Sequence, residues 1–171
     1  MKQLIQQVSQ QLQSHLQCKR PIIFVEPSCG DARILIQVKQ QFASNSHAYI
    51  GYDIDSTVLP PNLPVVKCRD YLQTSLADVL KDCNFNPTNQ AQQPLVVVVG
   101  GPPYNGDLPL QFVNHSLDNL GAALVVFIMP FRCRHDARAI QTLELPNCFF
   151  EFASQERITQ PSVLQIWRNE I

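Results

Sequence analysis

Four short segments of the chain place glycine, proline or acidic residues directly after runs of apolar residues. They are EPSCG (26–30), GYDID (51–55), CRDY (68–71) and GGPPY (100–104). A glycine in such a turn lets the backbone approach a ligand closely, and a carboxylate accepts hydrogen bonds from hydroxyl or amine groups. An aromatic ring beside two rigid prolines offers a flat surface for stacking. These residue types favour a ligand with polar groups and a planar ring.

The first two segments contain residues suited to a nucleoside. Asp53 follows Gly30 by close to the ~20 residues that separate the glycine turn from the ribose-binding acid in dinucleotide folds. We expect Asp53 to accept the ribose hydroxyls, with helix capping by Asp53 or Asp55 as the alternative. EPSCG lacks the GxGxxG pattern of dehydrogenases, and an acid there disfavours a phosphate and favours a cationic amino group. A plain tight turn at Gly30 is the alternative for that segment.

The last two segments contain groups that can bind a planar amine. Asp70 can accept a hydrogen bond from an exocyclic amine such as adenine N6, or it can cap a helix. In the first case Tyr71 or Leu72 would pack against the ring. Prolines cannot donate to a β-ladder, so GPPY should end its strand with its carbonyls facing outward. Tyr104 then offers a stacking surface worth about 1–3 kcal/mol for a nucleobase, or it lies in the core of a rigid turn.

Hydrophobic periodicity predicts alternating helices and strands. The spacing of Leu4, Ile5, Val8, Leu12 and Leu16 predicts an amphipathic helix near the N-terminus. Strands are expected at 22–25, 47–55, 65–70, 95–99, 121–130, 148–158 and 161–169, further helices at 30–42, 71–83, 107–120 and 135–143, and loops at 55–64 and 84–94.

Apolar strands that alternate with amphipathic helices predict an α/β fold with a mostly parallel sheet covered on both faces. The last two strands have only a short polar link between them, which predicts an antiparallel hairpin at one edge. No repeat or domain boundary is evident, so we expect one domain over 1–171, with the helix within 1–20 packed on its core. Ligands of such sheets bind beyond the carboxyl ends of the strands, where all four segments fall.

In the order and spacing of these segments, the sequence resembles the class I S-adenosylmethionine-dependent methyltransferases. It is most similar to the amino-methyltransferases that carry the tetrapeptide (Asp/Asn/Ser)-Pro-Pro-(Tyr/Phe/Trp). The resemblance covers nearly the whole chain, and GPPY (101–104) stands at the tetrapeptide. It implies a Rossmann-like sheet of seven strands, mostly parallel with an antiparallel C-terminal strand, and helices on both faces. It also implies S-adenosylmethionine as the cofactor and methyl transfer to an exocyclic amine, first of all adenine N6 of RNA or DNA.

The resemblance further implies roles for individual residues. Glu26 would lie near the methionine amino group, Asp53 would hold the ribose, and Asp70 would hold the adenine amine. The implied cofactor-binding set is Glu26, Pro27, Ser28, Gly30, Asp53, Ile54, Asp70, Tyr71 and Gly100. The implied catalytic set is Gly101, Pro102, Pro103 and Tyr104, and no metal is implied.

The chain departs from the family pattern at Gly101, which has no side chain to accept a hydrogen bond from the amine. Losing one polar contact directed at a transition state costs about 2.7–4 kcal/mol, or about 10²–10³ in rate. Asn105 would substitute only if the loop folded back. The missing side chain favours one alternative to the active enzyme, a catalytically weak or inactive methyltransferase-like subunit that binds the cofactor or a partner. A further alternative is a protein (glutamine) methyltransferase, which the missing side chain disfavours.

Charge limits the partners of the chain. Its 13 basic and 14 acidic residues give a net charge of −1, which is not the basic field of an autonomous nucleic-acid-binding protein. We expect no target-recognition domain between the third and fourth strands or after the last one, so recognition of RNA or DNA would rest on short loops or a partner subunit. Arg132, Arg134 and His135 can contact phosphate or form a solvated helix start.

The cysteines and the apolar runs indicate the compartment. The six cysteines are Cys18, Cys29, Cys68, Cys83, Cys133 and Cys148. Their spacing suits neither a zinc site nor a disulfide scaffold, so we interpret them as reduced thiols, of which Cys29 is placed to be reactive. The N-terminal stretch has no signal-peptide pattern, and no apolar run approaches the ~20 residues of a membrane span. We therefore expect an intracellular protein, cytoplasmic or nuclear, without a membrane partner.

Overall fold

The computed structural model describes residues 2–17, 20–44, 46–61, 63, 65–85, 93–151 and 157–169; Cys18 and residues 86–92 of the predicted loop 84–94 lie outside these ranges. The helices are α1 (Lys2–Gln17), α2 (Arg33–Gln41), α3 (Leu76–Asp82) and α4 (Leu108–Asn114), with short helical turns η1 (Tyr71–Gln73), η3 (His115–Asn119) and η4 (Phe131–Cys133). The strands are β1 (Ile22–Glu26), β2 (Ala48–Asp53), β3 (Val66–Cys68), β4 (Leu95–Gly100), β5 (Leu124–Pro130), β6 (Gln141–Leu145), β7 (Phe149–Glu151), β8 (Arg157–Thr159) and β9 (Ser162–Arg168).

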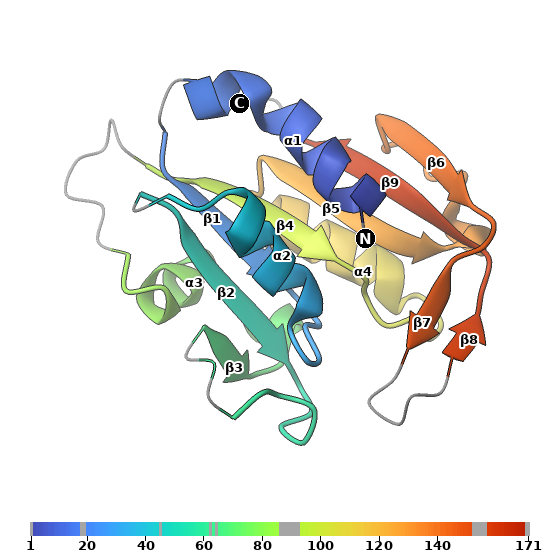
Figure 1. Cartoon of the computed structure of the whole chain (residues 1–171), viewed down its shortest axis with the longest axis horizontal. Helices are drawn as coiled ribbons and strands as arrows, with labels where there is room; N and C mark the ends of the chain where they lie inside the picture. The colour runs from blue at the N-terminus through green and yellow to red at the C-terminus, as the bar shows by residue number, and fades with distance from the viewer. Residues whose placement is uncertain are drawn as a thin grey trace.

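Seven strands form one sheet in the order β3-β2-β1-β4-β5-β9-β6 (Figure 1). The strands β3, β2, β1, β4 and β5 run parallel, as the sequence predicts. β9 is antiparallel to β5, and β6 is antiparallel to β9. The strands β2 and β3 extend the sheet on one side of β1, whereas β4 and β5 extend it on the other. The ends of β1 and β4 therefore flank the topological switch point, where open α/β sheets bind ligands.

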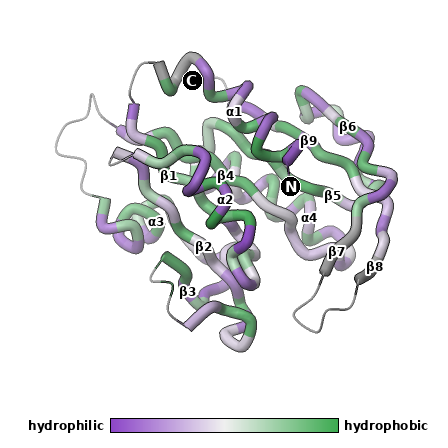
Figure 2. The backbone as a smooth tube through the Cα atoms, viewed as in Figure 1, coloured by the Kyte–Doolittle hydropathy of each residue, from purple (hydrophilic) through white to green (hydrophobic). Residues whose placement is uncertain are grey.

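Helices cover both faces of the sheet, and each face has its own apolar core (Figure 1). The helices α1 and α2 lie over one face and bury Leu4, Val8 and Leu35 there. The helices α3 and α4 lie over the other face and bury Val79 and Phe112. Every residue of β4 and β5 is buried, and Figure 2 shows these central strands as predominantly hydrophobic. Continuous apolar strands of this kind are typical of sheets covered on both sides.

The segment 135–143, predicted as a helix, is instead a turn that leads into the edge strand β6. Asp136 closes this turn by accepting hydrogen bonds from the backbone amide and the guanidinium group of Arg138. β6 then pairs along its length with the inner strand β9. Because an open strand edge offers unpaired backbone groups, this tertiary pairing overrides the helical spacing of the local sequence.

The C-terminal strand is antiparallel, as predicted, but the prediction of an edge hairpin is wrong. β9 lies inside the sheet, between β5 and β6. The predicted strand 148–158 contains two strands, β7 and β8, which pair with each other in a separate two-stranded sheet. Residues 152–156 of that prediction lie outside the described residues. Local alternation identifies strands but does not determine which partner each strand takes.

The predicted helix 71–83 is divided into two helical pieces. The turn η1 comes first, and α3 begins after Ser75. The Ser75 hydroxyl accepts a hydrogen bond from the Asp78 amide, and the Asp78 carboxylate accepts one from the Ser75 amide. This capping box satisfies amides that have no partner inside the helix, and it fixes the start of α3.

The packing of α1 gives a direct test of the core on its face of the sheet. Leu12 is 1% exposed, whereas the neighbouring Gln13 is exposed. We expect Leu12→Ala to lower the free energy of unfolding by about 2–5 kcal/mol, because it removes buried methyl groups and leaves a cavity. Gln13→Ala should stay within about 0.5 kcal/mol of the wild type. Urea unfolding of both variants measures this, and equal losses would contradict the packing of α1 on the sheet.

Candidate functional site

The carboxyl ends of three neighbouring strands meet at one edge of the sheet. β1 pairs with β2 on one side and with β4 on the other, all in parallel. The segments that follow these strands are EPSCG, GYDID and GGPPY, and CRDY follows β3 next to β2. The structure therefore brings all four segments of the sequence prediction to the same edge.

A hydrogen bond joins the first two segments. The Oδ2 atom of Asp53 accepts from the Gly30 amide at 2.9 Å, and its Oδ1 atom accepts from the Asp55 amide at 3.0 Å. Gly30 has φ 49°, in the left-handed region that glycine adopts without strain. Each carboxylate oxygen of Asp53 still has acceptor capacity for a further hydroxyl group. Asp53 thus holds the β1 loop and offers its carboxylate at the edge of the sheet.

Ile54 presents an apolar surface beside this carboxylate. Its side chain is 74% exposed, the largest value among the large hydrophobic residues of the described part of the chain. It directly follows Asp53, where β2 ends. An exposed aliphatic side chain adjoining a carboxylate suits a ligand with one apolar face and neighbouring hydroxyl groups, such as a nucleoside.

Glu26 is a buried carboxyl group at the end of β1. It is 2% exposed, and its Oε2 atom accepts from the Leu35 amide at 2.9 Å. The N-cap residue of α2, Ala32, makes no side-chain cap hydrogen bond, so Glu26 serves as a cap from outside the helix. Burial raises the pKa of Glu26 well above its ordinary value, and the nearby Asp31 and Asp53 raise it further, against the lowering effect of the Leu35 amide.

Gly100 and Pro27 complete the walls around Glu26. Gly100 has φ 147°, and a Cβ atom there would lie 3.3 Å from Cγ of Glu26 and 3.5 Å from Cδ of Pro27. Any side chain at position 100 would therefore crowd the carboxyl group. The close approach of β4 to Glu26 depends on this glycine.

The contacts of Asp70 match the alternative in which it caps a helix. Its Oδ1 atom accepts from the Leu72 amide at 3.0 Å and caps η1. Tyr71 lies in the core at 2% exposure, with its hydroxyl 2.7 Å from Ser116 Oγ and its ring against Phe112. The Tyr71 ring is therefore not available to pack against a ligand, because the second apolar core already encloses it. The half-buried Leu72 is the neighbour that can take this role.

Two hydroxyl groups hold the GPPY segment in place. The Ser28 hydroxyl donates to the Gly101 carbonyl at 2.8 Å, which joins the β1 loop to the β4 loop. The Tyr104 hydroxyl donates to the Ile128 carbonyl at 3.3 Å and lies 3.2 Å from Ser162 Oγ. Tyr104 is half-buried, and burial raises the pKa of its hydroxyl. The ring is thus tethered at its hydroxyl end rather than enclosed in the core.

Arg132 is a contact residue of this loop whose role the sequence reasoning missed. Its Nη2 atom donates to the carbonyls of Tyr104, at 2.5 Å, and Gly106, at 2.9 Å. The sequence left phosphate contact or a solvated helix start open for Arg132, Arg134 and His135. The predicted parallel sheet could have indicated this contact, because the pairing of β4 with β5 places the residues after β5 beside the residues after β4.

Gly101 is not required by the backbone or by close packing. Its φ is not positive, and an added Cβ would lie 3.6 Å from the Ile128 carbonyl oxygen, an ordinary van der Waals distance. Pro102 is buried and Pro103 is half-buried, so the tetrapeptide lies at the surface of the core. Position 101 therefore accommodates a Cβ atom without strain, and this sequence has none there.

Cys29 is not a reactive thiol in this setting. Burial raises the pKa of Cys29 to about 12, and the nearby Glu26 and Asp53 carboxylates contribute to the shift. The thiolate is the nucleophilic form, so the raised pKa, together with the 5% exposure of Cys29, lowers its reactivity at neutral pH. None of the five cysteines in the described residues forms a disulfide.

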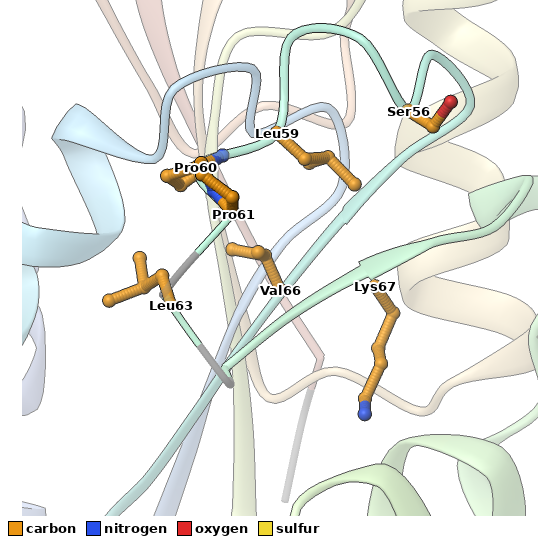
Figure 3. Close-up of a pocket in the computed structure, with 7 residues that line it drawn as sticks. All are labelled: Ser56, Leu59, Pro60, Pro61, Leu63, Val66 and Lys67. Atoms are coloured by element: carbon orange, nitrogen blue, oxygen red, sulfur yellow. The ribbon is translucent and has the colours of Figure 1, made fainter.

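A separate hollow of about 550 Å³ lies between the loop after β2 and the strand β3 (Figure 3). It is lined by Ser56, Leu59, Pro60, Pro61, Leu63, Val66 and Lys67. The hollow contains none of the acids, glycines or aromatic residues of the four segments. We assign the site to the strand ends because the groups with converging chemistry lie there.

The described part of the chain contains no cluster of three or more His, Cys, Asp or Glu side chains that could hold a metal ion. Among the same residues, no helix has the length and apolar character needed to cross a bilayer.

The arrangement of sheet and helices is the Rossmann-like fold of methyltransferases. The methyltransferase subunit of a type I restriction–modification system from Streptococcus thermophilus superposes with a TM-score of 0.55 at 14% identity, over 89% of this chain and 41% of that one. The 23S rRNA methyltransferase ErmE superposes with a TM-score of 0.50 at 12% identity, over 88% of this chain and 63% of that one. The chain thus spans less than two thirds of either protein. No protein-family model and no curated protein sequence matches it.

The buried Glu26 carboxyl should make stability depend on pH. Its pKa is raised in the folded state, so its stabilising contribution is complete below the ordinary value of 4.5 and is lost as the pH rises through the raised pKa. We expect Glu26→Gln, which keeps an acceptor for the Leu35 amide, to be more stable than the wild type at pH 8, with a smaller difference at pH 4. Thermal unfolding across this range measures the effect. The control is Glu144→Gln on the edge strand β6, where the side chain is exposed. A pH-independent difference between Glu26→Gln and the wild type would contradict the assignment.

The Arg132 contacts should restrain the turn after Tyr104. We expect Arg132→Ala to speed backbone amide exchange at Asn105, Gly106 and Leu108 by roughly tenfold, because two hydrogen bonds to that turn are lost. Hydrogen exchange followed by NMR measures these amides. Arg134→Ala is the control, since the Arg134 guanidinium stacks on Phe131 instead. Unchanged amide exchange rates in Arg132→Ala would show that the turn does not depend on the Arg132 hydrogen bonds.

Proposed function

We propose that this chain transfers a methyl group from S-adenosylmethionine to an exocyclic amine, namely adenine N6 of RNA or DNA. The observation that carries the proposal is the hydrogen bond from the Gly30 amide to Asp53. It sets the carboxylate at the end of β2 against the glycine turn after β1. The exposed Ile54 lies beside it, and GPPY follows β4, the strand on the other side of β1.

The residues at this edge fit the proposed cofactor. Asp53 has free acceptor capacity for two ribose hydroxyls, and Ile54 offers an apolar face for the adenine ring. Glu26 is a buried carboxyl that a cationic amino group would stabilise in its ionised form. Asp70 would accept from the adenine amine with the lone pairs that η1 leaves free. When bound, S-adenosylmethionine supplies an electrophilic methyl group on a sulfonium centre.

The β4 loop would position the methyl acceptor. The Pro102 carbonyl would accept a hydrogen bond from the target amine, and the Tyr104 ring would stack on the target base. The tethers from Ser28, Arg132 and Ser162 hold these groups in one geometry before substrate arrives. Orientation of this kind accounts for much of the rate enhancement expected for a direct transfer between two bound groups.

The nucleic-acid part of the proposal draws on the neighbours in fold. Their names describe a restriction–modification methyltransferase and a 23S rRNA methyltransferase. The net charge of this chain is −1, which is not the basic field of an autonomous nucleic-acid-binding protein. We therefore propose that recognition of the target depends on short loops or on a partner subunit. The free cysteines of the described part suit a reducing, intracellular compartment.

A second candidate function is a cofactor-binding subunit with little or no activity. The specific observation in its favour is that the backbone at position 101 would accept a Cβ atom, yet the residue there is glycine. Loss of the side chain at the first position of the tetrapeptide would weaken binding of the target amine, but it would leave the cofactor-binding residues unchanged. Both candidate functions require cofactor binding, but only the enzyme transfers a methyl group at an appreciable rate.

Calorimetric titration with S-adenosylhomocysteine tests the part that both candidates share. We expect Asp53→Ala to weaken binding by about 10–100-fold, because hydrogen bonds to a charged group are lost. Asp31→Ala, at an exposed ion pair of the same loop, should leave the affinity within about twofold. Equal affinity of the wild type and Asp53→Ala would contradict the ribose assignment.

Methyl transfer from radiolabelled S-adenosylmethionine to unpaired adenine-containing RNA and DNA distinguishes the two candidates. We expect the wild type to label adenine N6, and we expect Gly101→Asn to raise the rate by about 10–100-fold, since it adds an acceptor aimed at the transition state. Absence of labelling in both proteins, with the cofactor bound, would contradict the enzyme and favour the binding subunit.

A further inference from the structure

The Ser28 hydroxyl occupies a position between the two halves of the proposed site. We propose that it supplies the second hydrogen-bond acceptor for the target amine, in place of the side chain that Gly101 lacks. This inference rests on the proposed function of the site, but its test does not depend on methyl transfer.

Ser28 belongs to the loop after β1 and contacts the loop after β4. Its Oγ atom lies 2.8 Å from the Gly101 carbonyl oxygen, and both residues are half-buried at the carboxyl edge of the sheet. Glu26 and Gly30 flank it on the proposed cofactor side, whereas Pro102 and Tyr104 flank Gly101 on the proposed acceptor side. A hydroxyl that belongs to one loop and is hydrogen-bonded to the other is well placed to contact an amine bound between the two loops.

The contact to Gly101 determines how the hydroxyl can act. A serine hydroxyl has one proton and two lone pairs. The proton is committed to the Gly101 carbonyl, so toward any other partner the oxygen can only accept. An amine that donates one hydrogen to the Pro102 carbonyl has a second hydrogen to place. Ser28 Oγ would accept a hydrogen bond from that second N–H group. The nitrogen lone pair would then stay directed at the methyl group.

The other polar groups near the loop are less suited to this role. The Tyr104 hydroxyl is turned toward Ile128 and Ser162. Asn105 lies exposed in the turn toward α4, and Arg132 binds the carbonyls on either side of it. These contacts hold Tyr104 and Asn105 where they are.

The chemical step then balances without a further reactant. The amine nitrogen forms a bond to the methyl carbon as the carbon–sulfur bond breaks, and the sulfonium becomes a neutral thioether. The nitrogen carries the positive charge and releases one proton to water. Ser28 neither gains nor loses a proton, and it acts only by orienting the amine.

The test measures how the protein binds two nucleosides when S-adenosylhomocysteine is also bound. Adenosine has the exocyclic amine, and purine riboside lacks it but has the same ring. We expect the wild type to prefer adenosine by about tenfold, and Ser28→Ala to reduce that preference by about fivefold, because one hydrogen bond is lost. The conservative Ser28→Thr should keep the preference, and Asn105→Ala serves as a surface control. Far-UV circular dichroism and thermal unfolding show whether each variant is folded, and each nucleoside is titrated at a concentration of S-adenosylhomocysteine that saturates that variant.

Each outcome is decisive for Ser28. A wild type that binds both nucleosides equally would overturn the proposal, and so would Ser28→Ala with the wild-type preference. Loss of the preference in Ser28→Thr as complete as in Ser28→Ala would also overturn it. A preference that depends on the hydroxyl, in a protein that transfers no methyl group, would uphold Ser28 as an acceptor and contradict the proposed enzyme instead.

Discussion

The hydrogen bond between the Asp53 carboxylate and the Gly30 amide is the contact on which the candidate site depends. It connects two loops that are distant in sequence but adjacent in space, because β1 and β2 pair in parallel. Without it, the left-handed turn at Gly30 would have no partner for its amide. With it, the loop after β1 is drawn toward the end of β2, and Glu26, Ser28 and Asp53 lie at one edge of the sheet.

The GPPY loop illustrates a second constraint, which arises from proline. Pro102 and Pro103 have no amide hydrogen, so β4 cannot extend its ladder beyond Gly100. Side chains from other elements secure the segment instead: Ser28 from the β1 loop, Arg132 from η4 and Ser162 from β9. Rigid backbone held by three separate elements is what positioning of a reactive group requires. This is why the antiparallel strand β9, far from the loop in sequence, contributes to the site.

The sequence predicted the features that depend on local chemistry. Apolar runs bounded by proline and glycine located β1, β2, β4 and β5, and the structure brings the acid-containing segments at their ends to one edge of the sheet. The predictions failed where pairing in space decides. The local amino-acid sequence does not indicate that Gln141–Leu145 forms a strand paired with β9. It also does not indicate that the Tyr71 ring packs against Phe112. The contacts of Arg132 and Ser28 with backbone carbonyls follow from strand order, which periodicity does not determine.

The most direct test of the central claim is a crystal structure of the chain with S-adenosylhomocysteine. We expect the ribose hydroxyls to contact the Asp53 carboxylate, the adenine ring to lie against Ile54, and the amino group of the ligand to approach Glu26. Ligand in the hollow lined by Leu59 and Val66, or no bound ligand at saturating concentration, would contradict the assignment of the site to the strand ends.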